Sequence, residues 1–381
     1  MAYFDNAATT FPKPEEVYRK MDEFYRLSGG SAGRGSHTLS QNTGALLRDT
    51  RERIGRVLDA GAKQVIFTAT ATIALNMVIQ GVIEKGARTV YISPFEHNAV
   101  TRVLHSFEEK AQIHVIQLKT SDDLVYDMEG IRYQFEKERP DLVIMSHVSN
   151  VIGLISPVAE VFRLAKGYGA TTVVDMAQSA GLVKLAVGQE TVDFAVFAGH
   201  KTLYGPTGIS GFLMKPSFDL PPVLFGGTGY DSANQNMPDS LPERYEMGTL
   251  NTSGIAGLNA ALCWIEEVGS EKLLEVEVRN RQRLIDLFER YWFLRVVGNS
   301  VAARFTGIVS CVMDGISSDS AGQVFDQQGI SVRTGLQCAP LAHQFLRTFP
   351  AGTIRFSTSF FTSEADYEEL QNALDYIAEN L

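Results

Sequence analysis

TTVVDMAQSAG, residues 171–181, is an apolar and β-branched run that ends in an aspartate and then in small and polar residues. Such a run predicts a strand that is buried on both faces of a parallel sheet. Further short apolar runs lie between residues 60 and 215, and helical patterns separate most of them. This alternation predicts βα units and a mostly parallel sheet covered by helices. The expected strands are 65–68, 88–93, 113–118, 142–147, 171–175, 194–198 and 208–214, and the expected helices are 73–84, 98–109, 128–137 and 158–167.

The pattern changes after residue 215. Residues 216–250 are rich in Pro, Gly, Asn and Asp, which predicts a long irregular segment of a kind that is often functional. The sequence therefore predicts an α/β protein with a large domain, residues 16–255, and a smaller α+β domain formed by residues 1–15 and 256–381. In the smaller domain we expect helices at 254–268, 270–291 and 363–379, and strands at 307–313, 330–333 and 353–357.

Composition and charge exclude several classes of protein. The 381 residues are 45% hydrophobic and 20% charged, which is typical of a folded globular chain. Lys and Arg number 34 and Asp and Glu 44, so the net charge is 34 − 44 = −10, which disfavours nucleic acid as the main partner. No apolar run approaches the roughly 20 residues that cross a bilayer, and the N-terminus lacks a signal-peptide pattern, so no membrane association is expected.

The cysteines and histidines narrow the chemistry further. Cys263, Cys311 and Cys338 are far apart, so they predict neither a disulfide framework nor a Cys-x-x-Cys metal site. The 7 histidines show no metal-ligand spacing, and we expect no metal centre. These features predict a protein of the reducing cytoplasm, with Cys263 and Cys311 in the apolar core.

Polar or ionisable residues follow five of the expected strands. In open parallel sheets, ligands bind at the carboxyl ends of the strands. A single polar strand end is more often a satisfied structural group than a functional one, but five at one edge favour a ligand site. These segments are 69–72, 94–97, 147–150, 175–178 and 199–201.

Three of these strand ends suggest one cofactor. Thr70, Ala71 and Thr72 begin a helix, where N–H groups and hydroxyls form an anion site, although an ordinary N-cap explains them equally well. Asp175 ends a buried strand and needs a cation or donors, which a protonated pyridine nitrogen would provide. Lys201, at another strand end, would be desolvated and have a usable amine. An anion anchor, a carboxylate and a lysine are the groups that pyridoxal 5′-phosphate requires.

The chain is similar, nearly end to end, to the class V aminotransferase family of pyridoxal-phosphate enzymes, and within it to the cysteine desulfurases. The combination of VDMAQSAG and GHK is specific to the family, and the loop around Cys338 points to the desulfurase and selenocysteine lyase group. The resemblance implies fold type I of the pyridoxal-phosphate transferases and a homodimer with shared active sites. It rests on YFDNAATT (3–10), EHNA (96–99), HVSNVIG (147–153), VVDMAQSAG (173–181), GHKTLYGPTGI (199–209), RYEMGTLNT (244–252) and RTGLQCAPLAH (333–343).

The resemblance implies a role for each residue of a cofactor site. Lys201 would bond covalently to the cofactor and later act as a base. Asp175 would hold the pyridine nitrogen protonated, and Gln178 would bind the phenolic oxygen. His97 would stack on the ring and move protons. The implied phosphate ligands are Ala71, Thr72 and His200, together with Thr249 of the neighbouring copy in the dimer.

The same resemblance implies a substrate site and a nucleophile. Asn150 and Arg355 would hold the carboxylate of L-cysteine, since a bidentate Arg–carboxylate pair fixes the orientation of an amino acid. Cys338 would attack the substrate sulfur and carry it as a persulfide, leaving L-alanine. Arg333, five positions earlier, would lie at the substrate site and favour the Cys338 thiolate. A sulfur-acceptor protein is then a further expected partner.

Two glycine-rich segments also resemble segments of the family. Residues 28–40, SGGSAGRGSHTLS, are expected to cover the active-site entrance with His37 pointing inward, and their glycines suit a close approach to a ligand. Residues 225–239 resemble those of a subgroup of desulfurase-like proteins whose substrates are less well defined.

The chain also departs from the family pattern. Ala198 stands where many desulfurases have a serine that binds phosphate, and Gln337 stands where a histidine commonly precedes the cysteine. Thr202 is an additional residue before the LYGPTG stretch. The cysteine loop is short, which disfavours sulfur transfer to a large acceptor because a short loop moves less.

The leading hypothesis is a cysteine desulfurase that acts on L-cysteine. A selenocysteine lyase or a cysteine β-lyase of the same family is the nearest alternative, and selenocysteine turnover would survive the loss of Cys338. An aminotransferase or an epimerase would act without releasing sulfide. A fourth alternative is a sulfur-carrying partner of an assembly machine, with slow turnover that an accessory protein accelerates.

Overall fold

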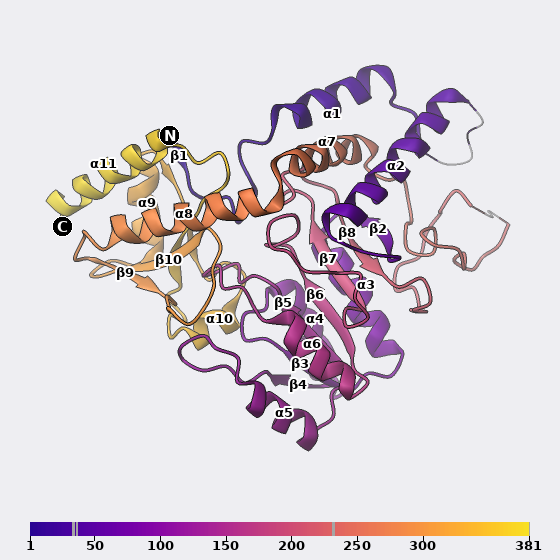
Figure 1. Cartoon of the computed structure of the whole chain (residues 1–381), viewed down its shortest axis with the longest axis horizontal. Coiled ribbons are helices and arrows are strands. Elements are labelled where there is room, and N and C mark those ends of the chain that lie inside the picture. Colours follow the sequence, from indigo (N-terminus) through magenta and orange to yellow (C-terminus); the bar gives the residue numbers. More distant parts are fainter. Residues whose placement is uncertain (33–34, 36, 231–232, 381) are drawn as a thin grey trace.

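The computed structural model describes residues 1–32, 35, 37–230 and 233–380. Its larger part is built around a seven-stranded sheet with the order β2-β8-β7-β6-β5-β3-β4 (Figure 1). Neighbouring strands from β4 through β7 are parallel, whereas β8 runs antiparallel to β2 and β7, which confirms a mostly parallel sheet. The strands are β2 (Gln64–Thr68), β3 (Thr89–Ile92), β4 (His114–Gln117), β5 (Leu142–Ser146), β6 (Thr171–Asp175), β7 (Phe194–Ala198) and β8 (Ser210–Met214).

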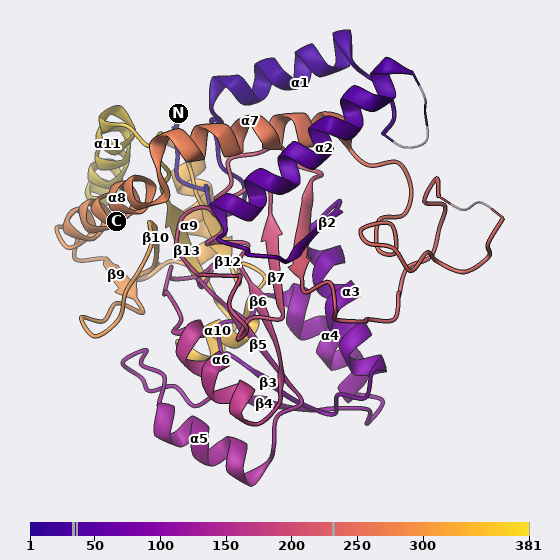
Figure 2. The ribbon, with the colours of Figure 1, turned by 45° about the vertical axis from the view of Figure 1, so that its right-hand side comes forward.

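Helices cover both faces of this sheet because its central strands are apolar on both sides. Successive side chains of a strand point to opposite faces. Leu142 and Ile144 of β5 therefore join one hydrophobic core, while Val143 and Met145 join another. The helices are α3 (Ala71–Glu84) and α4 (Asn98–Glu108) on the first core, and α5 (Met128–Lys137), α6 (Val158–Gly167) and α7 (Thr252–Val268) on the second (Figure 2).

Two helices near the N-terminus, α1 (Glu15–Leu27) and α2 (Thr38–Val57), lie along α7. The described parts of the segment between β8 and α7 project from the body of the molecule in both views (Figures 1 and 2). Its described residues form no helix or strand, which confirms the irregular character expected there. Among the described helices, none combines the length and the apolar character that crossing a membrane requires.

A smaller domain contains a four-stranded antiparallel sheet with the order β12-β13-β10-β9. The first strand, β1 (Ala2–Tyr3), pairs with β11 (Ile330–Ser331), and Ala2 and Phe4 lie in the core of this domain. The α/β class with a smaller α+β domain is confirmed, whereas the boundaries at residues 15 and 255 stay a prediction. The other elements are α8 (Ser270–Phe288), β9 (Leu294–Val297), β10 (Ile308–Met313), α9 (Ser318–Gln327), β12 (Arg333–Gly335), α10 (Pro340–Phe345), β13 (Thr353–Ser357) and α11 (Glu364–Asn380).

Candidate active site

A cavity of about 230 Å³ lies at the carboxyl edge of the large sheet. All five polar segments that were expected at strand ends contribute residues to it, so their convergence is confirmed. Two other hollows, of about 520 and 570 Å³, lie elsewhere in the molecule and are more open to solvent. The described residues that line them include no buried lysine and no buried carboxyl group. The cavity is lined by Thr70, Ala71, Thr72, Leu75, His97, Ala99, Ser146, Val148, Asn150, Asp175, Ala177, Gln178, Ala198, His200 and Lys201.

Lys201 follows β7 and lines the cavity. The N-terminal segment holds its backbone, since the Thr10 hydroxyl donates to Lys201 O at 2.7 Å and the Thr10 N–H donates to His200 O at 3.1 Å. Burial lowers the pKa of Lys201 to about 8, although the nearby Asp175 opposes this shift. A lysine with such a pKa has a neutral fraction at physiological pH and can act as a nucleophile or a base.

Asp175 ends β6 with a buried carboxyl group that has no arginine or lysine hydrogen-bonded to it among the described residues. Its Oδ1 accepts a hydrogen bond from the Ala177 N–H at 2.8 Å. Burial raises the pKa of Asp175, against the opposing effects of this hydrogen bond and of the Lys201 charge. A buried carboxyl group of this kind is stabilised by a cation. Gln178 lines the cavity beside it and donates from Nε2 to Ala7 O at 2.7 Å.

His97 caps α4 and is held as a neutral imidazole. Its Nδ1 accepts a hydrogen bond from the Ala99 N–H at 3.0 Å. Burial lowers the pKa of His97 to about 4, and the positive charge of Lys201 adds to this effect. Because Nδ1 is the acceptor, we assign the ring hydrogen to Nε2.

The start of α3 offers an anion site. The Thr70 hydroxyl caps this helix by accepting from the Ile73 N–H at 3.2 Å, and the N–H groups of Ala71 and Thr72 lie in the first turn, where a helix provides no partners. His200 adds a ring nitrogen: its Nδ1 is buried and has no hydrogen-bond partner in the part of the chain that the structure describes. Burial lowers the pKa of His200 to about 4. An unpartnered buried nitrogen near a helix N-terminus fits an anionic ligand.

Cys338 is exposed and lies between β12 and α10. Gln337 and Cys338 both have a left-handed backbone, with φ of 40° and 57°, which is unfavourable for residues with a Cβ atom. Two hydrogen bonds hold this conformation, because Asn150 Nδ2 donates to Gln337 O at 2.7 Å and the Asn98 N–H donates to Cys338 O at 2.7 Å. Since Asn150 also lines the cavity, the cysteine loop is tied directly to the cavity.

The side chain of Gln337 anchors this loop from within the protein. Its Nε2 donates to Thr353 O at 3.0 Å, and its Oε1 lies 2.8 Å from His343 Nε2. The other ring nitrogen of His343 lies 2.7 Å from the Thr348 hydroxyl, and burial lowers the pKa of His343 to about 4. A neutral imidazole can therefore donate to Gln337 in the folded protein. Gln337, a departure from the family pattern, is thus a buried structural residue.

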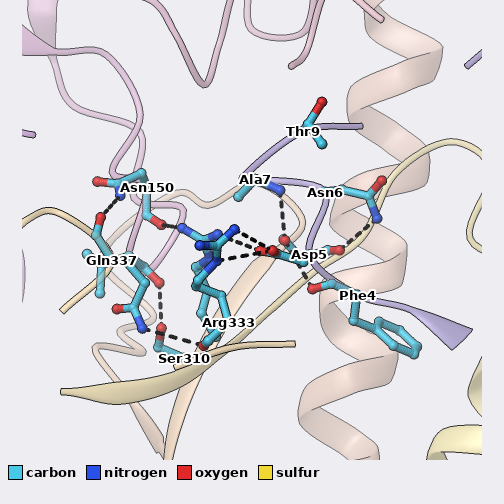
Figure 3. Close-up of polar contacts among 12 residues, drawn as sticks. Phe4, Asp5, Asn6, Ala7, Thr9, Asn150, Ser310, Arg333 and Gln337 are labelled. Carbon is cyan, nitrogen blue, oxygen red and sulfur yellow. Dashed lines mark hydrogen bonds and ion pairs between the residues drawn. The ribbon is translucent and has the colours of Figure 1, made fainter. Parts of the chain in front are cut away.

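Next to the cavity lies a second region, here called the cysteine side, which comprises Asp5, Arg333, Arg355 and the loop with Gln337 and Cys338. Arg355 and Arg333 do not line the cavity. Arg355 is 3% exposed and donates from Nη1 to Asn150 O at 2.9 Å and from Nη2 to Asp5 Oδ1 at 2.8 Å. Arg333 binds the other carboxylate oxygen of Asp5 (Figure 3). Arg333 precedes Cys338 by five positions and pairs across the sheet with Arg355. The expected effect of Arg333 on the Cys338 thiol stays a prediction.

Comparison with known proteins places this architecture in a family. The sequence profile described as Aminotransferase class-V matches residues 2–370. The chain belongs to the class V aminotransferase family.

Relatives of this class V aminotransferase carry a more specific name. A "Probable cysteine desulfurase" of Pyrococcus abyssi is 30% identical, over 100% of this chain and 94% of its own length. A "Probable cysteine desulfurase 2" of Mycobacterium leprae is 30% identical, over 97% of this chain and 90% of its own length. The apo structure of a cysteine desulfurase from Thermococcus onnurineus NA1 is similar with a TM-score of 0.90 at 29% identity, and the match covers 100% of this chain and 95% of that one.

Two further predicted site residues of this class V aminotransferase, like Arg333, Arg355 and Cys338, do not line the cavity. Thr249 lines a separate hollow of about 230 Å³ together with Ile73 and Met247. His37 caps α2, since its Nδ1 accepts a hydrogen bond from the Ser40 N–H at 3.3 Å. The roles of Thr249 and His37 stay predictions. Residues 33, 34 and 36 of the expected covering segment, and residues 231 and 232 of the segment 225–239, lie outside the described residues.

Sequence analysis alone does not identify Asp5 as part of the class V aminotransferase site. Its two arginine partners lie 328 and 350 positions away, and the only local signal is its place in the YFDNAATT motif. One structural expectation is wrong: Cys311 is buried as expected, but Cys263 is only partly buried. Cys263 lies near the end of α7, whose amphipathic pattern leaves one side of the helix outside the core.

Proposed function

We propose that this protein is a cysteine desulfurase that binds pyridoxal 5′-phosphate in the cavity and converts L-cysteine to L-alanine, with the sulfur passing to Cys338 as a persulfide. The observation that carries this proposal is the hydrogen bond from Asn150, which lines the cavity, to the backbone of the loop that presents Cys338. Class V aminotransferases are pyridoxal-phosphate enzymes, and the relatives named above as desulfurases span the whole chain, which supports it.

The lining residues fit this cofactor. Its phosphate would be bound by the N–H groups of Ala71 and Thr72 at the start of α3 and by the unpartnered ring nitrogen of His200. Asp175 is a buried carboxyl group that a protonated pyridine nitrogen would neutralise, and Gln178 would bind the phenolic oxygen. When bound, the cofactor supplies an electron sink for the bonds at the α- and β-carbons of the substrate.

Lys201, His97 and Cys338 would divide the proton and sulfur chemistry. The Lys201 amine, with its lowered pKa of about 8, would hold the cofactor and then move the proton of the substrate α-carbon. His97 keeps Nε2 available for proton exchange because its Nδ1 caps α4. Cys338 Sγ would form an S–S bond with the substrate sulfur as the C–S bond breaks. One L-cysteine and one Cys338 thiol thus become one L-alanine and one persulfide.

The remaining predicted residues would serve the substrate and the partners. Arg355 and Asn150 would bind the substrate carboxylate, because Asn150 lines the cavity and contacts both the cysteine loop and Arg355. Thr249 lies outside the cavity of its own chain, and its proposed role is in the phosphate site of a second copy in a homodimer. A sulfur acceptor would take the sulfur from Cys338, whose side chain is exposed.

Product analysis tests this proposal. The cofactor-loaded protein is incubated with L-cysteine and a thiol reductant, and sulfide, alanine and pyruvate are quantified together. Equal amounts of sulfide and alanine are expected. Pyruvate and ammonia in place of alanine would mean β-elimination and would remove the proposed role of Cys338. Turnover of L-selenocysteine without turnover of L-cysteine would favour a selenocysteine lyase.

A further inference from the structure

Two arginines face each other directly across neighbouring strands of the smaller domain. Arg333 of β12 and Arg355 of β13 are partners in the antiparallel register. Like charges that lie opposite each other in a sheet repel. The Arg355 side chain is only 3% exposed, so water does little to screen this repulsion, and a buried guanidinium needs a counter-ion. The pair is therefore stable only with a negative group between the two side chains.

Asp5 is that negative group. Its Oδ1 binds Arg355 Nη2 at 2.8 Å. Its Oδ2 binds Arg333 Nη2 at 2.9 Å and Nε at 3.1 Å (Figure 3). The strand that carries Arg355 also holds Asp5, because the Ser357 N–H donates to Phe4 O at 2.7 Å, immediately before Asp5. The position of the carboxylate is thus coupled to the position of the guanidinium that it binds.

Arg355 keeps donors for a ligand despite these contacts. An arginine has five N–H groups. In the described residues, Arg355 uses Nη1 for Asn150 O and Nη2 for Asp5, while its Nε has no partner. The guanidinium is therefore held at two points and retains donors for a further carboxylate.

The charge of this cluster matches one carboxylate. Two guanidinium groups and one carboxylate give a net charge of +2 − 1 = +1. A ligand with a single acidic group neutralises that charge. A ligand with a second acidic group adds a negative charge that no remaining positive charge of the cluster balances. In a largely buried site, the repulsion between this group and the Asp5 carboxylate remains strong over several ångströms.

We propose that Asp5 is a specificity-determining residue that sets the charge of the substrate site, so that amino acids with one acidic group bind better than amino acids with two. This inference rests on the proposed function, in which Arg355 holds the substrate carboxylate. Asp5 would have two effects: it orients Arg355, and its negative charge lowers the net charge of the site by one. Only the effect on net charge distinguishes ligands that differ in charge.

Binding titrations of the cofactor-loaded protein test this role. The absorbance spectrum of the cofactor reports binding of L-alanine, with one carboxylate, and of L-aspartate, with two. In Asp5→Asn, which keeps the shape of the side chain and removes its charge, we expect the ratio of the L-aspartate Kd to the L-alanine Kd to fall by about tenfold. The matched control, Arg333→Gln, removes one positive charge from the same cluster, and the ratio should rise. This rise should be smaller, since the Arg333 side chain is 50% exposed and water screens its charge.

The outcomes separate a charge-setting residue from a structural one. Opposite shifts of the ratio in the two variants support the proposal. A purely structural role of Asp5 would weaken both ligands alike, and an unchanged ratio would overturn the inference while leaving the proposed function intact. If Asp5→Asn does not fold, an unchanged ratio in Arg333→Gln alone has the same meaning. If L-alanine does not change the spectrum of the wild-type protein, the proposed function itself fails and this inference fails with it.

Discussion

The cofactor cavity and the cysteine side of the site bury carboxyl groups in opposite ways. Around the cavity, burial raises the pKa values of Asp175 and Glu96, that of Glu96 to about 8, and no described arginine pairs with either. On the cysteine side, Asp5 lies between Arg333 and Arg355. In the first region no described arginine pairs with these carboxyl groups, and the region suits a ligand that brings a cation. The second retains positive charge and suits an anion, so a protonated cofactor ring and a substrate carboxylate would complement the two regions.

The two regions also differ in how the chain assembles them. The cavity is built from the ends of strands in a single sheet, so its polar residues meet as soon as the strands are in register. The cysteine side joins the N-terminal segment, the residues after β5 and two strands of the smaller domain through contacts such as Asn150 to Gln337, 187 positions apart. A substitution on the cysteine side should therefore disturb the contacts of the cysteine side itself and leave ligand binding in the cavity largely intact.

The largest expected effect comes from Lys201 in the cavity. In Lys201→Ala, sulfide release from L-cysteine should fall by about 10³-fold or more, because the amine proposed to hold the cofactor and move the α-proton is lost. Sulfide and alanine assays measure this change, and the circular dichroism spectrum controls for folding. Turnover within tenfold of the wild-type rate would contradict the assignment of Lys201.

Cys338→Ala tests whether the two regions are separable. Sulfide release from L-cysteine should fall by about 10²-fold or more, while L-alanine still changes the cofactor spectrum with its wild-type Kd, because the cavity does not contain Cys338. Cys263→Ser is the matched control, since this second accessible cysteine lies on α7 and should be dispensable. Undiminished sulfide release by Cys338→Ala would refute the persulfide step.

Glu96→Gln examines how the cavity region accommodates a buried carboxyl group. Glu96 accepts hydrogen bonds from the Ser146 N–H at 2.6 Å and the Ser146 hydroxyl at 2.9 Å. Because burial raises its pKa from 4.5 to about 8, the folded protein keeps a proton that the unfolded chain loses in this range. The resulting stabilisation is complete below pH 4.5 and is lost as the pH rises through the folded pKa of about 8.

Glutamine does not titrate, so the variant should not lose stability in this way as the pH rises. Relative to the wild type, its free energy of unfolding should increase by about 3 kcal/mol between pH 5 and pH 8. Urea unfolding at both pH values measures the difference. Glu271→Gln, at an exposed pair with Lys184, is the control and should follow the wild-type profile. Parallel profiles for Glu96→Gln and the wild type would show that Glu96 is ionised in the folded protein.

The smallest expected effect is on stability and comes from Gln337. Gln337→Ala removes the hydrogen bonds to Thr353 O and His343 and leaves these buried groups unpaired, so the free energy of unfolding should fall by about 1–2 kcal/mol. Chemical denaturation measures this change. Arg347→Ala, which breaks an exposed ion pair with Asp122 next to α10, should leave stability unchanged. A loss of L-alanine binding in Gln337→Ala would show that the two regions are more tightly coupled than their contacts suggest.

Much of the large domain follows from local sequence patterns. The strands at 171–175 and 194–198 and the helices at 128–137 and 158–167 have the predicted bounds, because apolar periodicity acts over a few residues. The helices α1 and α2 were not expected. Within the described parts of the chain, α1 has no side-chain cap, and α2 has a ring nitrogen of His37 as its cap, which is not one of the usual N-cap side chains. Their stability comes from packing along α7, a tertiary contact that no local pattern reveals.

The meeting of the polar residues at the cavity follows from the sequence alone. Parallel strands bring their carboxyl ends to one edge, and each of these residues ends its strand or follows it within a few positions. By contrast, the position of Asp5 between Arg333 and Arg355 and the burial of Gln337 are visible only in the folded protein. These contacts depend on strand pairing between the two ends of the chain. The pairing buries Arg355 and Asp5, and burial strengthens the effect that the charge of one carboxylate has on a bound ligand.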